Sequence, residues 1–313
     1  LSGTVVATLA EGTGEIEFDR VSILSSRSSF QFTGAIGPRP DEGQADFEPG
    51  YRYELISRQS RVEPSDSTEP ALLVAVSLSG GIDPGWSRIV ADSIAVGTDQ
   101  GGAFGNAMVE LQPGMAPGLD LSLAIPQIAV SQAKLLWPWF AAPGARRWAM
   151  ANVFGGTLEE SRLTLNVEPG FFGHGRALNA DQLKGHFGVR GARFDVAGAI
   201  PPMRDAVGKL DIKGMDIDVA LESGSVFMPS GRSVAARAGT LAIRNANIQP
   251  LTGALDIQVS GKADAVAEIA TYDPINISRF IDLAPADLRG DVEGMVKARV
   301  PLQPGIPANQ LNW

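Results

Sequence analysis

The sequence predicts a mainly β fold, an elongated antiparallel sheet with two short helical insertions. Three observations support this. Stretches in which apolar and polar residues alternate recur along the chain, and in a β-strand successive side chains point to opposite faces. The 36 glycines and 21 prolines separate these stretches as turns do. The helical period of apolar residues replaces the alternation at two places only.

Residues 1–130 are predicted to form the first segment of the sheet. Strand-like stretches run from TVVATLA to LDLSLAIPQIAV, and polar loops such as 37–50 separate them. The glycine spacing of GGAFGNA (101–107) could suggest a phosphate loop. It is not followed by Lys-Ser or Lys-Thr, so we interpret it as a β-turn or β-bulge.

Residues 131–154 are predicted to form the first helical insertion, as two short helices. Pro138 lies inside the first helical pattern and should shorten it. A group of tryptophans is interpreted as packing these helices onto the sheet, with a ligand platform as the alternative. The group consists of Trp137, Trp139 and Trp148.

Alternation returns over 155–261, the central segment of the sheet, and 262–285 form a second helical insertion split at Asp273-Pro274. Residues 286–313 carry a C-terminal strand within ADLRGDVEGMVKARVPL. The chain opens directly in a strand and stops without a clear end. We therefore expect it to continue into a longer protein, with natural ends after processing as the alternative.

The charge and composition exclude several classes of function. The formal net charge is -9 and no Lys/Arg cluster is present, which argues against binding to nucleic acid or to anionic lipid surfaces. There is no cysteine, so disulfides and thiol chemistry are excluded. No run of about 18 apolar residues exists that would span a membrane.

No catalytic constellation is recognisable. The two histidines, His174 and His186, lie in a Gly-rich turn and in an alternating strand, which does not suit a metal site. Asp216 and Asp218 share one strand face and are interpreted as solvated. No GxSxG nucleophile elbow is present. We expect no enzyme activity, no metal and no cofactor.

The apolar strand faces need a partner. A compact sandwich should contain large aromatic core residues, but aromatic residues make up only 7% of the chain. The alternative is a sheet that curls around its apolar face and leaves an open groove. An acyl chain fits such a groove, because each buried CH₂ contributes about 0.8 kcal/mol and one chain roughly 10 kcal/mol before ordering costs.

The residues predicted to line this groove are the apolar members of the alternating strands. They are Leu163, Leu165, Val167, Leu210, Ile212, Leu241, Ile243, Leu255, Ile257, Val259, Val292, Val296 and Val300. A register error of one residue would move a whole strand's set to the other face.

Several motifs resemble the AsmA-like family, in particular its YhdP-type members. The first insertion carries Trp137-Pro138, Arg147-Trp148 and the Gly156-Thr157-Leu158 entry to a strand. A Pro-Pro pair at 201–202 precedes the Gly-x-Leu-x-Ile-x-Gly pattern of 208–214. The helix-then-strand tail closes at Pro301. The likeness covers about residues 119–302. Residues 1–118 share only the general pattern of alternating strands, without the motifs.

The resemblance implies a bacterial bridge-like lipid transfer protein. Such proteins are long periplasmic β-grooves of Gram-negative bacteria that are implicated in moving glycerophospholipids toward the outer membrane. They are anchored in the inner membrane by an N-terminal helix, which this chain lacks, and other envelope proteins could meet the groove ends. The rival reading is a non-transporting β-rich scaffold that assists outer-membrane assembly or binds a partner along a sheet edge.

Overall fold

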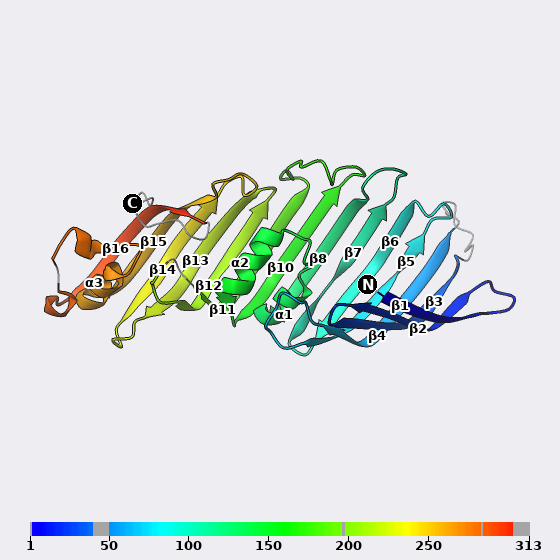
Figure 1. The fold of residues 1–313 in the computed structure, drawn as a ribbon, viewed down its shortest axis with the longest axis horizontal. Helices are drawn as coiled ribbons and strands as arrows, with labels where there is room; N and C mark the ends of the chain where they lie inside the picture. The colour runs from blue at the N-terminus through cyan, green and yellow to red at the C-terminus, as the bar shows by residue number, and fades with distance from the viewer. Residues whose placement is uncertain (1, 40–49, 196–197, 283, 303–313) are drawn as a thin grey trace. The chain divides into compact units, whose positions relative to one another are not determined.

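The computed structural model describes residues 2–39, 50–195, 198–282 and 284–302 (Figure 1). The chain divides into two compact units. Unit 1 consists of Leu1–Arg147 with Glu160–Lys184, and unit 2 of Trp148–Glu159 with Gly185–Trp313. Each unit has its own cluster of buried apolar side chains. Most of the loop predicted at 37–50 lies outside the described residues.

The strands of the described residues belong to one open antiparallel sheet, which confirms the mainly β fold. The neighbours in the sheet follow chain order, apart from the short β9, which pairs with β11. The strands are β1 (Ser2–Leu9), β2 (Ile16–Ser25), β3 (Ser28–Pro38), β4 (Tyr51–Val62), β5 (Leu72–Ile82), β6 (Arg88–Thr98), β7 (Gly101–Glu110), β8 (Gly118–Ala129), β9 (Val153–Phe154), β10 (Thr157–Val167), β11 (Leu183–Phe194), β12 (Met203–Lys213), β13 (Asp216–Phe227), β14 (Ser233–Ile243), β15 (Thr252–Lys262) and β16 (Asp291–Pro301).

The helices lie at the two places where the helical period appears in the sequence. They are α1 (Val130–Leu136), α2 (Pro143–Asn152) and α3 (Ala263–Thr271), followed by the 3₁₀ turns η1 (Ile277–Arg279) and η2 (Pro285–Asp287). In the fold, α1 and α2 connect β8 to β10, and α3 with the two turns connects β15 to β16 (Figure 1).

The interpretation of the tryptophans as packing residues is wrong for two of them. Helix α1 ends at Leu136, before Pro138, whose ring and missing N–H are incompatible with a helix interior. Trp139 therefore falls in the following turn and is 74% exposed, and Trp148 on α2 is 51% exposed. Trp137 is half-buried, and its Nε1 donates a hydrogen bond to a main-chain carbonyl.

The glycines of 101–107 serve the sheet, as predicted. This segment lies in β7, and the register between β7 and β8 shifts between Gly102 and Phe104, with the extra residue on β8. A Cβ added to Gly105 would lie 1.9 Å from the carbonyl oxygen of Ser122. The glycine is needed because two backbones approach closely there.

Helix α1 covers part of one sheet face in unit 1. Leu135 packs against buried residues of β4 and β5, namely Val62, Leu72 and Val74. The packing removes apolar surface from water at about 25 cal/mol per Å², which stabilises the helix on the sheet.

Two buried cations hold the same insertion to the loop between β4 and β5. The Nζ of Lys134, whose side chain is 5% exposed, lies 3.3 Å from the Oε1 of Glu69. The guanidinium of Arg146 is paired with Asp66 and donates from Nε to the carbonyl oxygen of Trp137. Buried charges are costly unless they are paired, so these contacts hold Lys134 and Arg146 against the loop between β4 and β5.

Helix α3 has the equivalent place in unit 2. It contacts β14, β15 and β16, and Ala265 is buried against Val226 on β13 and against Val234 and Ala236 on β14. Ala265 on the helix and Ala236 on β14 have small side chains, which lets the helix backbone lie close to the sheet. Leu210, Leu241 and Leu255 are not among the residues that pack in this cluster.

Candidate functional site

The predicted lining residues of unit 2 lie on one face of the sheet. Antiparallel partners that stand directly opposite each other point to the same side. The register pairs Leu210 with Val219, Val219 with Leu241, Leu241 with Leu255, and Leu255 with Ala298. This is one continuous row of aliphatic side chains across β12 to β16.

Further rows run beside this one and contain the other predicted residues. The row toward one end of the strands contains Ile212, Ile217, Ile243, Gly253 and Val300. Three rows lie toward the other end of the strands. The first contains Gly208, Leu221, Gly239, Ile257 and Val296, and the second contains Ala236, Val259 and Gly294. The third contains Val226, Val234, Gly261 and Val292. We call all these residues together the unit 2 apolar face.

The rows differ in what covers them. Val226, Val234 and Ala236 are buried, and Val259 packs against the same cluster beneath α3. In the Gly208 row, Leu221 and Ile257 also pack against this cluster. The rows of Leu210 and Ile212 lie outside it, and their aliphatic side chains are half-buried. The side chain of Leu241 reaches diagonally toward Gly253. A Cβ added to Gly253 would lie 2.6 Å from the Cδ1 of Leu241. The glycine therefore makes room for neighbouring side chains on this face.

The opposite face of the same strands is polar. Its charged side chains pair across strands: Arg244 with Asp218 at 2.5 Å, and Lys297 with Asp256 at 3.1 Å. His186 Nδ1 lies 2.6 Å from Asp211 on this face. The sheet of unit 2 is thus amphipathic, with aliphatic residues on one side and solvated ion pairs on the other.

The remaining predicted residues lie on β10 in unit 1. Asn166 donates a hydrogen bond to Asp120 on β8, which places both on the same face. Leu163, Leu165 and Val167 alternate with it and are half-buried or buried on the other face. Strand β10 is therefore amphipathic as well.

Sequence reasoning missed the contribution of β13. Ile217, Val219 and Leu221 complete the rows between β12 and β14. The alternating pattern DIDVAL in the sequence carries them, with Asp216 and Asp218 at the intervening positions. Those two carboxylates do lie on one face: Asp218 pairs with Arg244, and Asp216 accepts a hydrogen bond from the main-chain N–H of Asn245.

The described residues were also compared with the requirements of a metal site and of a membrane-spanning helix. In the described ranges, no three or more His, Cys, Asp or Glu side chains are grouped so that they could hold a metal ion. No helix within these ranges combines the length and apolarity needed to cross a bilayer.

Comparison with known proteins gives no assignment. No family model, curated protein or solved structure matches the chain. The resemblance to AsmA-like proteins therefore stays a prediction from the sequence motifs.

Proposed function

We propose that this chain carries glycerophospholipids by holding their acyl chains against the apolar faces of its sheet. In the full protein this would conduct lipid across the periplasm between the inner and outer membranes, as the resemblance to YhdP-type proteins implies. The observation that carries the proposal is the continuous set of aliphatic rows from β12 to β16, which no second sheet covers in the described residues.

The physical support is the cost of leaving that face in water. Aliphatic side chains gain about 25 cal/mol for each Å² of surface removed from water. An acyl chain lying across the rows would remove such surface and needs no polar recognition. The residues on the face are Leu, Ile, Val, Ala and Gly, so chains can slide along it without crossing a charged side chain.

The proposal assigns no chemical step to the protein. An acyl chain moving along the face would leave one apolar contact and form another of the same kind, so each step changes the free energy little. The polar face keeps its ion pairs in solvent during this exchange. Charged headgroups would stay at the rim of the face, where water is accessible.

Site-specific photocrosslinking in cells tests this proposal. A photoreactive amino acid is placed at Val296 on the apolar face, and the matched control is Lys297, the next residue, which is exposed on the polar face. Leu165 and Thr164 form a second such pair on β10. We expect lipid adducts at Val296 and Leu165 and at least a tenfold lower yield at Lys297 and Thr164.

The alternative function, a scaffold for outer-membrane assembly, gives the opposite result. Adducts at Val296 and Leu165 that contain only protein would reject lipid carriage and favour a partner chain on this face. Equal lipid yield at neighbouring residues on the two faces would also count against the proposal, because it would indicate nonspecific contact with membrane.

A further inference from the structure

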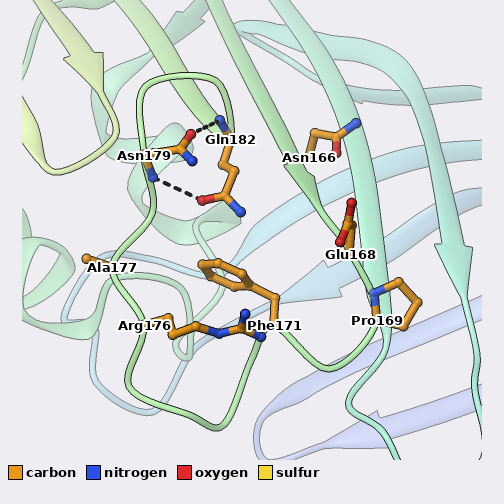
Figure 2. A pocket seen from close by; sticks show the side chains of 8 residues that line it. All are labelled: Asn166, Glu168, Pro169, Phe171, Arg176, Ala177, Asn179 and Gln182. Atoms are coloured by element: carbon orange, nitrogen blue, oxygen red, sulfur yellow. Dashed lines mark hydrogen bonds between the residues drawn. The ribbon is translucent and has the colours of Figure 1, made fainter.

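A pocket of about 560 Å³ lies in unit 1 where β10 ends and the loop to β11 begins (Figure 2). Its walls come from two directions. Asn166 belongs to the end of β10, Glu168 directly follows the strand, and the loop contributes the others. The polar or aromatic loop residues at the pocket are Phe171, Arg176, Asn179 and Gln182.

The guanidinium of Arg176 is held in a defined position. One of its terminal nitrogens donates a hydrogen bond of 2.7 Å to the carbonyl oxygen of Gly170. Its central carbon lies 4.7 Å from the centre of the Phe171 ring, a cation–π contact. Phe171 is itself buried, so it provides a fixed support. The loop therefore presents a positive charge whose position is set before any ligand binds.

Two side-chain amides supply neutral donors. The Oε1 of Gln182 accepts a hydrogen bond from the main-chain N–H of Asn179, and the Oδ1 of Asn179 accepts from the main-chain N–H of Gln182 (Figure 2). These bonds occupy the amide oxygens and fix the orientation of both groups. Their NH₂ groups then remain as donors, a set that suits an anionic oxygen beside Arg176.

The opposite charge lies on the strand side of the pocket. Glu168 lines the same cavity, yet it makes no ion pair with Arg176 or with another cation in the described part of the chain. The pocket thus keeps one positive and one negative side chain apart. A ligand with both charges would pair with each of them, whereas a single ion would meet one group of its own sign.

We propose that this pocket binds a zwitterionic phosphate–ammonium group, with the phosphate beside Arg176 and the amides and the ammonium beside Glu168. The chain's net charge of -9 also disfavours a simple anion. The role as a headgroup site rests on the proposed lipid carriage. Asn166 alternates with Leu165 and Val167, so the pocket lies at the end of β10 on the face opposite the predicted lining residues. Free phosphoethanolamine and a phosphatidylethanolamine headgroup share this chemistry.

The test is an NMR titration of the purified chain with phosphoethanolamine, with ethanolamine and inorganic phosphate as the two half ligands. We expect saturable shifts at residues 166–182 with phosphoethanolamine and at least tenfold weaker binding of each half. Arg176→Gln and Glu168→Gln should each weaken phosphoethanolamine binding at least tenfold. Arg162→Gln, an exposed β10 variant outside the pocket, should leave it unchanged.

The outcomes separate this inference from the lipid-carriage proposal. The pocket assignment is overturned if no saturable binding is found, or if Glu168→Gln binds phosphoethanolamine as well as the wild type. This conclusion does not depend on the result of crosslinking at Val296. Dihexanoyl phosphatidylethanolamine that binds more tightly than phosphoethanolamine supports a lipid source, and equal binding supports a free small molecule. Circular dichroism of each variant confirms that a loss of binding is not a loss of fold.

Discussion

Two residues of β14 illustrate how position on one face decides the role of an aliphatic side chain. Val234 and Leu241 both belong to the unit 2 apolar face. Val234 lies beneath α3 and is 2% exposed, whereas Leu241 lies beyond the helix and is half-buried. The first is therefore part of a core that stabilises the fold. Under the proposed function, the second would contact a bound acyl chain.

Truncation of these two side chains should have different effects on stability. Val234→Ala leaves a cavity under α3 and should lower the free energy of unfolding by about 1–3 kcal/mol, and Leu241→Ala, although it removes more carbon, should cost less than about 1 kcal/mol. Urea denaturation of lipid-free protein measures both. A larger loss for Leu241→Ala would mean that its part of the face is already packed by protein.

At the scale of elements, the turn between β13 and β14 holds α3 by charge. Arg232 donates from Nε to Asp264 at 2.8 Å and from a terminal nitrogen to Glu268 at 2.6 Å. The Ser230 hydroxyl donates to the same Glu268. The hydrogen bond from Arg232 is the main cause that lowers the pKa of Asp264 below its usual value of 3.8. Ionised Asp264 is thus favoured by the docked helix.

The stability of unit 2 should accordingly depend on pH in the acid range. A carboxyl whose pKa is lower in the folded state contributes stability above its unfolded pKa, and the contribution is lost as pH falls through the folded value. We expect the urea midpoint to fall as pH decreases below about 4. Arg232→Gln should reduce this fall, because it removes the partner that shifts the pKa. The same acid dependence in wild type and variant would contradict the assignment.

At the scale of the whole molecule, the chain is organised by amphipathic strands in one sheet with small helical covers. The sheet has no second β layer in the described residues, so much of its apolar surface is covered only in part. Soluble proteins rarely leave continuous apolar areas of this kind without a binding role. A ligand that binds only the folded sheet should therefore stabilise it.

Lipid binding should be visible as thermal stabilisation. A single-chain phospholipid at 100 times its dissociation constant should add about 2.7 kcal/mol and raise Tm by several degrees. Leu255→Asp places a charge on the apolar face outside the cluster beneath α3 and should abolish the rise, while Gln258→Asp on the opposite, exposed face should retain it. An equal rise in both variants would mean that the lipid does not bind on the apolar face.

Alternation and turn residues predict much of this fold. Residues 292–300 and 255–259 show which side chains share a face within their own strands, because the period of a strand is two. The place of the 101–107 glycines in the sheet and the shortening of α1 before Pro138 also follow from local chemistry. The exposure of Trp139 was not predicted. Pro138 marks where the helix stops, but no local pattern tells whether the side chains of the following turn pack on the sheet.

The amino-acid sequence by itself determined the strands, their amphipathic character and the places of the helical insertions, because these depend on neighbours close in the chain. Only the tertiary structure decided that separate strands align their aliphatic residues in continuous rows and that α3 covers one end of them. It also decided that Glu168 and Arg176 line one pocket without pairing. These features depend on register and on long-range packing, which no local pattern encodes.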